Sequence, residues 1–345
     1  MKDELPPDPR ETEDHPRRQL SLIGHNGAEA QLRAAHASGR LHHGWLLTGP
    51  RGIGKATLAF RFARFLLKYP DPARLPSSNT LAVPGEDPVA KLVGAGSHPD
   101  LFSLQRFWDA KNERLQAETS VAEARKAETF FGRTAAYGGW RVCVVDAADD
   151  LNENAANALL KTLEEPPPRS IFLLINHAPG AILRTIRSRC IRLDLQALSR
   201  PETVDAIRGT EAGRGLSPEE VTSLAALSEG SPGRALELAD SMGAKAFERF
   251  LALRLPAEPS GAYELAEMLA ARGQDDDFRL FSELLLSHVA GRARMEAEKG
   301  GMSAGAWAEA HGQIGHSLRV ANGLNLDRRQ LVLDLLKILG DAAKS

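Results

Sequence analysis

Residues 44–56 read GWLLTGPRGIGKA, so a short apolar segment leads directly into a glycine-rich turn. The apolar segment predicts a buried strand, and the one-sided apolar stripe of residues 56–67 predicts a helix after the turn. From Gly49 to Ala56 the turn matches the phosphate-binding pattern GxxxxGK(S/T) at every position but the last. Glycines let backbone N–H groups surround phosphate oxygens, and a lysine neutralises the terminal phosphates. The alternative is a strand-to-helix turn that binds no nucleotide. The predicted nucleotide-binding residues of the turn are Gly49, Gly52, Gly54 and Lys55.

Two positions near this turn lack the side chains that ATP hydrolysis requires. Ala56 stands where a hydroxyl normally binds Mg²⁺, and Thr57, rotated by about 100° on a helix, cannot simply replace it. Asp146 ends a β-branched apolar run and would help to hold Mg²⁺, but Ala147 follows where a glutamate normally activates water. Asp149 is better explained as the start of a loop or a helix cap than as a substitute base. The sequence therefore argues against efficient hydrolysis and for a weakened Mg²⁺ site, and it is compatible with ATP binding without hydrolysis as well as with a turn that binds no nucleotide.

The order of apolar runs predicts the fold class. Strand-like runs alternate with helical segments up to about residue 195, which indicates an α/β domain with a parallel sheet flanked by helices. Beyond that point strand-like runs disappear, and Ser217-Pro218 and Ser231-Pro232 have the form of helix starts. The expected parts are a disordered tail at 1–18, a P-loop α/β domain at 19–195, a small helical domain at 196–243 and a helical C-terminal domain at 244–345.

Composition excludes several classes of protein. The 345 residues carry a net charge of -2, unlike a strongly basic DNA-binding chain, so any nucleic-acid contact is expected to be local or shared with partners. The only cysteines, Cys143 and Cys190, cannot form a four-cysteine zinc site within one chain. The N-terminal segment lacks the apolar run of a signal peptide, and no stretch suggests a membrane span. We therefore expect a cytoplasmic location.

Two further motifs carry a resemblance to a known family. Residues 157–167 read NALLKTLEEPP, and Ser188-Arg189-Cys190 follows about twenty residues later. Together with Asp146, they resemble the clamp-loader branch of the AAA+ family, in particular the delta-prime subunits of bacterial DNA polymerase III. His98-Pro99-Asp100-Leu101 fits the same group. The resemblance covers residues 20–238 by motif and the remainder only by helical character.

The resemblance implies a fold, a function and partners. The fold would be an AAA+ core, a helical lid and a C-terminal collar that assembles a pentamer. The function would be that of a mostly non-hydrolysing member of the DNA polymerase III holoenzyme, which helps to load the sliding clamp onto primed DNA. The partners would be the tau/gamma motor and delta subunits, the sliding clamp and, through the complex, primer-template DNA. Many related subunits carry a zinc module, but residues 68–104 contain no cysteine, so we expect no zinc.

The resemblance also assigns roles to three polar residues. Asn176 matches sensor 1, Arg234 matches sensor 2 in the lid, and Arg189 matches an arginine finger that acts in trans on a neighbour's ATP. Each residue has a simpler interpretation. Asn176 could cap a turn, Arg234 could sit in the first turn of a helix, and Arg189 could belong to a solvated basic loop.

Two other functions remain open at this point. An active AAA+ ATPase, such as the motor subunit of a clamp loader, would keep the hydroxyl, the glutamate and the zinc cysteines that this chain lacks. A P-loop nucleotide or small-molecule kinase would have no arginine acting in trans and no long helical C-terminal domain. Measurable ATP turnover by the purified chain would favour the first of these alternatives.

Overall fold

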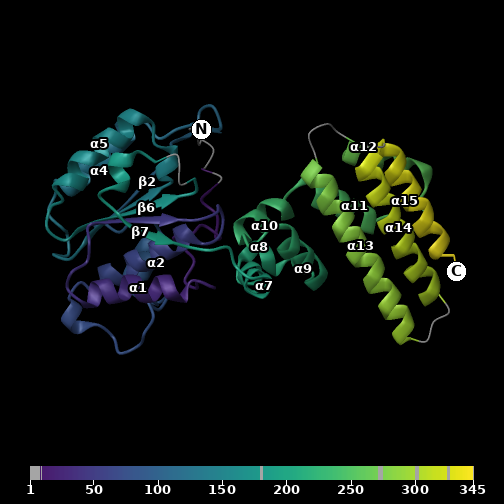
Figure 1. The fold of residues 1–345 in the computed structure, drawn as a ribbon, viewed down its shortest axis with the longest axis horizontal. Helices are drawn as coiled ribbons and strands as arrows, with labels where there is room; N and C mark the ends of the chain where they lie inside the picture. The colour runs from purple at the N-terminus through teal and green to yellow at the C-terminus, as the bar shows by residue number, and fades with distance from the viewer. Residues whose placement is uncertain are drawn as a thin grey trace, which may run out of the picture. The chain divides into compact units, whose positions relative to one another are not determined.

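The computed structural model describes residues 8, 10–178, 182–270, 275–299, 303–324 and 327–344 (Figure 1). The chain divides into two compact units, Met1–Glu211 and Ala212–Ser345. Among the described residues, no helix is both long and apolar enough to cross a membrane.

The first unit is built on a five-stranded sheet with the strand order β2-β5-β6-β1-β7. Every neighbouring pair of strands is parallel, which confirms the predicted parallel α/β fold. β1 lies between β6 and β7 and is buried along its whole length, as its continuous apolar sequence predicts. The strands are β1 (Gly44–Thr48), β2 (Leu101–Gln105), β5 (Arg141–Asp146), β6 (Ser170–Asn176) and β7 (Ile191–Asp194).

Helices cover both faces of this sheet, α1 and α2 on one face and α4 and α5 on the other (Figure 1). β6 fills both layers because successive side chains of a strand point to opposite faces. Ile171, Leu173 and Ile175 pack in a cluster with α2, whereas Phe172 and Leu174 pack in a cluster with α4 and α5. The helices are α1 (Asn26–Ala37), α2 (Lys55–Lys68), α4 (Val121–Phe131) and α5 (Glu153–Glu164).

Shorter elements complete the first unit and connect its strands and helices. They are η1 (Pro72–Arg74), α3 (Pro88–Gly94), the hairpin of β3 (Trp108–Asp109) and β4 (Arg114–Leu115), η2 (Ala148–Asp150), α6 (Arg184–Arg187) and α7 (Arg200–Arg208).

The expected disordered tail is wrong for residues 10–18, because part of this segment packs against α2. The His15 ring is buried and meets the Phe60 ring edge-on, with ring centroids 6.0 Å apart. Arg64 is only 1% exposed, and its guanidinium donates a hydrogen bond of 2.8 Å to the Arg17 carbonyl. A polar segment is thus ordered by buried arginine rather than by its own apolar surface. The rest of the expected tail, residues 1–7 and 9, lies outside the described residues.

The second unit is helical in all of its described residues that form regular structure. The helix start predicted at Ser217-Pro218 is confirmed, because Ser217 Oγ accepts from the Glu220 N–H at 3.2 Å and Glu220 returns the contact to the Ser217 N–H. The helices are α8 (Glu211–Arg214), which spans the boundary between the units, α9 (Pro218–Leu227), α10 (Pro232–Ala239), α11 (Met242–Leu251), α12 (Pro259–Ala270), α13 (Asp275–Glu298), α14 (Ala304–Leu324) and α15 (Arg328–Ala342).

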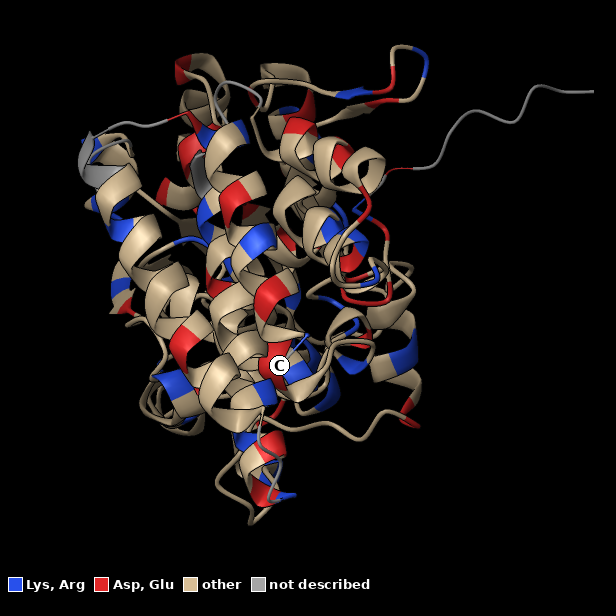
Figure 2. Ribbon diagram, turned by 90° about the vertical axis from the view of Figure 1, so that its right-hand side faces the viewer, with Lys and Arg blue, Asp and Glu red and all other residues tan. Residues whose placement is uncertain are grey.

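Acidic and basic side chains are interspersed along the helices of the second unit (Figure 2). This mixture agrees with the near-neutral composition of the chain and with the absence of a strongly basic sequence. The predicted division into a lid at 196–243 and a collar at 244–345 stays a prediction.

Candidate functional site

The glycine-rich turn lies between β1 and α2, at the carboxyl end of β1. Gly49, Gly52 and Gly54 have φ values of 148°, 76° and 105°, which L-residues with side chains rarely adopt. The backbone N–H of Leu195 bonds to the Thr48 carbonyl, so the chain after β7 crosses the start of the turn. A Cβ on Gly49 would lie 2.3 Å from the Leu195 carbonyl oxygen. The close approach therefore requires glycine at this position.

Lys55 begins α2 and directs its side chain into the turn. The residue is 2% exposed, and its Nζ donates hydrogen bonds to the carbonyls of Gly49, at 2.7 Å, and of Pro50. Burial lowers the Lys55 pKa to about 8, although Asp149 and Asp146 act in the opposite direction. The ammonium thus donates hydrogen bonds to the turn's own carbonyls, and it would have to leave them to bind phosphate oxygens.

Three aspartates lie at the carboxyl end of β5: Asp146 is its last residue, and Asp149 and Asp150 follow in η2. Burial, and to a smaller extent the nearby Asp150, raise the Asp146 pKa to about 6 against the opposing effect of Lys55. Asp150 forms an ion pair with Arg106 at 3.0 Å. Asp149 lies in η2 and accepts a hydrogen bond of 3.0 Å from the His177 N–H. This cluster faces a lysine and arginines, so its charge is largely balanced within the chain.

Asp149 does not cap the following helix, α5. The N-cap of α5 is Asn152, whose side chain accepts from the Ala155 N–H at 2.9 Å. Two positions that normally carry groups for hydrolysis are alanines and so have no polar side-chain atoms. Ala56 lies in the first turn of α2, and Ala147 directly follows β5 and is 3% exposed. Within the described part of the chain, no group of three or more His, Cys, Asp or Glu side chains is placed to hold a metal ion, and a role of Asp146 in holding Mg²⁺ stays a prediction.

Asn176 lies beside the turn because β6 pairs with β1 in a register that sets it opposite Thr48. The side chain is 1% exposed, and its Oδ1 accepts a hydrogen bond of 3.1 Å from the Ala178 N–H. This contact is the turn cap that the simpler interpretation of Asn176 predicts. Its role as sensor 1 stays a prediction.

Two histidines adjoin this site and were not identified from the sequence. His25 contacts the Ile53 carbonyl through Nε2 at 2.7 Å and so supports the turn from α1. The pKa of His177 is lowered to about 4, chiefly by burial and then by the positive charge of Lys55. Neither residue stands in a motif, because both reach the site through the packing of separate elements. The signal available was their position, His177 directly after Asn176 and His25 at the start of a helix.

Arg189 lies at the opposite end of the strands, near their amino ends. β7 begins at Ile191, which pairs with Trp45 near the start of β1. A Cβ built on Gly44 would lie 3.0 Å from the Arg189 carbonyl oxygen. Since a strand rises about 3.3 Å per residue, Arg189 is separated from Gly49 by about 16 Å along β1. The amino ends of the strands therefore hold Arg189, and their carboxyl ends hold the glycine-rich turn.

Arg234 belongs to the second unit. Its backbone N–H donates to Ser231 Oγ at 3.2 Å in the first turn of α10, and its guanidinium lies 3.7 Å from the Glu229 carboxylate. This is the position that the simpler interpretation predicts. The sensor 2 role of Arg234 stays a prediction.

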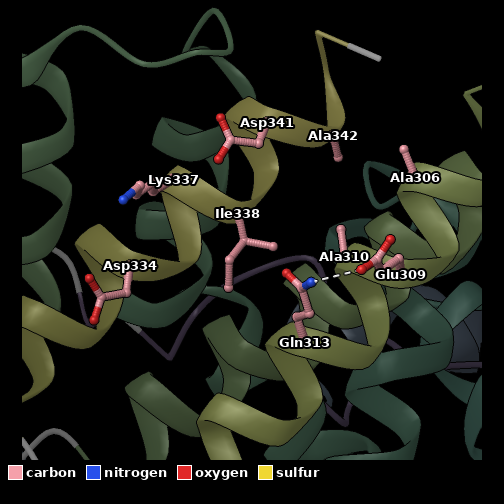
Figure 3. A pocket seen from close by; sticks show the side chains of 9 residues that line it. All are labelled: Ala306, Glu309, Ala310, Gln313, Asp334, Lys337, Ile338, Asp341 and Ala342. Carbon is pink, nitrogen blue, oxygen red and sulfur yellow. Dashed lines mark hydrogen bonds between the residues drawn. The ribbon is translucent and has the colours of Figure 1, made fainter.

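The second unit has a groove of about 460 Å³ between α14 and α15 (Figure 3). Ala310 and Ile338 contribute apolar surface, while Glu309, Asp334 and Asp341 are acidic. The groove has no glycine-rich turn, and its three carboxylates outnumber its one lysine, Lys337, so its charge would disfavour phosphate. The carboxyl edge of the sheet in the first unit is therefore the better candidate for a nucleotide site.

Asp146→Asn is expected to stabilise the fold at pH 7, because it removes a buried charge. The expected gain in the free energy of unfolding is only about 1–2 kcal/mol, because solvent screens part of the effect. The folded pKa of about 6 lies above the ordinary 3.8, so between these values the folded chain keeps a proton that the unfolded chain releases. Wild-type stability should thus fall as the pH rises through this window, and the variant should lose that dependence. Urea unfolding from pH 4 to 7 measures both effects.

The matched control is Asp205→Asn, at an exposed position of α7. This variant should keep the wild-type dependence of stability on pH. An Asp146→Asn profile that follows the wild type through the window would contradict a raised pKa at Asp146.

The arrangement of this site can be compared with known proteins. The family described as DNA polymerase III, delta subunit, matches residues 24–199, which contain the glycine-rich turn, Asp146 and Arg189. The chain belongs to this family. The match covers just over half of the 345 residues and ends at the start of α7.

Relatives with assigned names show the same similarity. The chain is 37% identical over 201 residues to DNA polymerase III subunit delta' of Pseudomonas aeruginosa, covering 58% of this chain and 55% of the relative. It is 33% identical over 208 residues to the delta' subunit of Escherichia coli, covering 60% and 58%. The alignments thus span little more than half the length of these relatives. Among solved structures, a Thermotoga maritima RuvB variant is 19% identical over 83% of this chain and 86% of its own, with a TM-score of 0.43.

Proposed function

We propose that this chain acts as a delta-prime-type subunit of a DNA polymerase III clamp loader. In this role it helps to load the sliding clamp onto primed DNA without efficient ATP hydrolysis of its own. Its contribution to hydrolysis is Arg189, which stabilises the charge that develops on ATP bound to a neighbouring subunit.

The observation that carries this proposal is the separation of Arg189 from the chain's own phosphate-binding turn. The two lie at opposite ends of the strands of one parallel sheet, about 16 Å apart along β1. An arginine side chain cannot span that distance while Glu164 and Thr185 hold it at the amino edge. An arginine finger at this position therefore has to serve a nucleotide held by another subunit.

The state of the chain's own turn supports the same division of roles. Lys55 is bonded to the turn's carbonyls, and Ala56 and Ala147 carry no groups that ligate Mg²⁺ or activate water. Gly49, Gly52, Gly54, Lys55, Asp146, Asn176 and Arg234 are the proposed nucleotide-binding residues. We expect ATP binding to displace the Lys55 ammonium from the Gly49 carbonyl toward phosphate.

The proposed partners are the tau/gamma and delta subunits, the sliding clamp and primer-template DNA held by the complex. Similarity to subunits of this kind supports the proposal, for example 27% identity over 219 residues to the gamma subunit of Buchnera aphidicola, covering 63% of this chain and 56% of that relative. The near-neutral charge favours phosphate contacts that are shared between subunits over strong DNA binding by this chain alone.

Calorimetry on the purified chain tests the proposed nucleotide site. We expect ATP to bind with an affinity that changes less than about tenfold when Mg²⁺ is removed, because the hydroxyl ligand is missing at Ala56. Lys55→Ala should abolish the binding heat, because the side chain that neutralises the phosphates is removed. The same preparation should show no ATP turnover above background, with or without DNA.

Measurable turnover that Lys55→Ala removes would contradict the proposal and favour an active ATPase. Tight binding that strictly requires Mg²⁺ would show that another residue replaces the missing hydroxyl. Matched unfolding curves for the wild type and the variant ensure that a loss of binding reflects the missing ammonium rather than a loss of folded protein.

A further inference from the structure

The guanidinium of Arg189 is held on its own domain by three groups. Its Nη2 lies 2.6 Å from Glu164 Oε1, its Nη1 donates to the Thr185 carbonyl at 2.9 Å, and Nη1 also contacts Ser188 Oγ at 3.4 Å. The two side chains of the ion pair are only partly exposed, 34% for Arg189 and 48% for Glu164. The arginine therefore has a defined position on the surface instead of extending freely into water.

Glu164 is itself fixed by the core. It is the last residue of α5, and the preceding Leu163 and Leu159 are almost fully buried under the sheet. The Glu164 backbone thus directly follows packed residues, and its carboxylate contacts an arginine that follows the short helix α6. This contact connects the two motifs of the sequence, LLKTLEEPP and Ser-Arg-Cys, in one ion pair.

The position of Glu164 does not favour the helix that carries it. The carboxyl end of a helix has partial negative charge, so an acidic side chain there opposes the helix dipole. The stability of α5 thus gives no reason for a glutamate at its last residue, whereas the ion pair with Arg189 gives this glutamate a role.

We propose that Glu164 is a positioning residue for Arg189, an inference that rests on the proposed action of Arg189 in trans. A free arginine side chain samples many rotamers, and each must be given up when the guanidinium binds a phosphoryl group. Glu164 restricts these rotamers before the neighbour's nucleotide arrives, and the oriented guanidinium then loses less entropy in the transition state. Glu164 touches no substrate and acts only through Arg189.

The test uses the clamp loader reassembled from its purified subunits. Glu164→Ala should lower kcat for ATP hydrolysis about two- to fivefold at the site that receives Arg189, the range for a partly exposed ion pair, with KM for ATP little changed. Glu164→Gln, which keeps an oxygen acceptor, should lie between the wild type and Glu164→Ala. Glu165→Gln is the matched control, because it removes the same charge from the exposed residue next to Glu164 and should leave kcat unchanged.

Two further readouts separate positioning from a structural role. The melting temperature of Glu164→Gln should stay close to that of the wild type, because the loss of the ion pair is offset by the removal of a charge that opposes the helix dipole. In an Arg189→Ala background, Glu164→Ala should cause no additional loss of kcat.

An unchanged kcat for Glu164→Ala, or an equal further loss in the Arg189→Ala background, would overturn the positioning role and leave the proposed function intact. An Arg189→Ala complex with normal turnover would instead overturn the action in trans and the positioning role with it. The two failures are therefore distinguishable in one set of measurements.

Discussion

Arg189→Ala is expected to slow ATP hydrolysis about 10³-fold at the neighbouring site that receives this side chain, the lower end of the effect of arginine fingers in trans. The physical reason is that the guanidinium stabilises charge that develops on the transferred phosphoryl group. Arg189 is available for this role because it lies at the amino edge of its own sheet, beside Gly44 and away from the glycine-rich turn. Single-turnover hydrolysis at saturating ATP in the reassembled complex measures the loss.

Arg187→Ala provides the control for Arg189→Ala. Arg187 is an exposed residue of α6 with the same charge, two residues from Arg189. Its variant should hydrolyse ATP at the wild-type rate, and both variants should assemble into the complex equally well. Equal rates for Arg189→Ala and Arg187→Ala would remove the trans role and leave Arg189 as part of a solvated basic loop.

Gly49→Ala is expected to destabilise the first unit by about 2–5 kcal/mol. Its φ of 148° is unfavourable for a residue with a side chain, which contributes about 1–2 kcal/mol. The added Cβ would also lie 2.3 Å from the Leu195 carbonyl oxygen, and overpacking of this kind contributes about 1–3 kcal/mol. Urea unfolding followed by circular dichroism measures the change in the free energy of unfolding.

Gly138→Ala separates the two causes of this loss. Gly138 also has a positive φ, 67°, but an added Cβ there would meet no atom within 4 Å. This variant should lose only the smaller, conformational contribution. If Gly49→Ala costs no more than Gly138→Ala, the chain after β7 does not constrain the turn as closely as the structure indicates.

The regular elements of the first unit were largely predictable because their signals are local. The apolar runs at 141–146 and 170–176 coincide with β5 and β6, and the glycine-rich turn lies between a strand and a helix as predicted. The N-terminal segment was not predictable in the same way. Residues 10–18 carry no apolar pattern, and their order depends on the buried guanidinium of Arg64, which lies far along the chain.

Some properties of the candidate site were likewise predictable from local sequence, and others depend on tertiary contacts. The sequence by itself determined that a glycine-rich turn of the P-loop pattern is present and that Ala56 and Ala147 lack the groups for hydrolysis, because these properties depend on residue type at fixed spacing. Only the tertiary structure decided that Lys55 bonds to the turn's own carbonyls and that Glu164 holds Arg189. Such contacts depend on strand order, register and burial, which bring together side chains from different elements. The length of β1, rather than any motif, separates Arg189 from the chain's own glycine-rich turn.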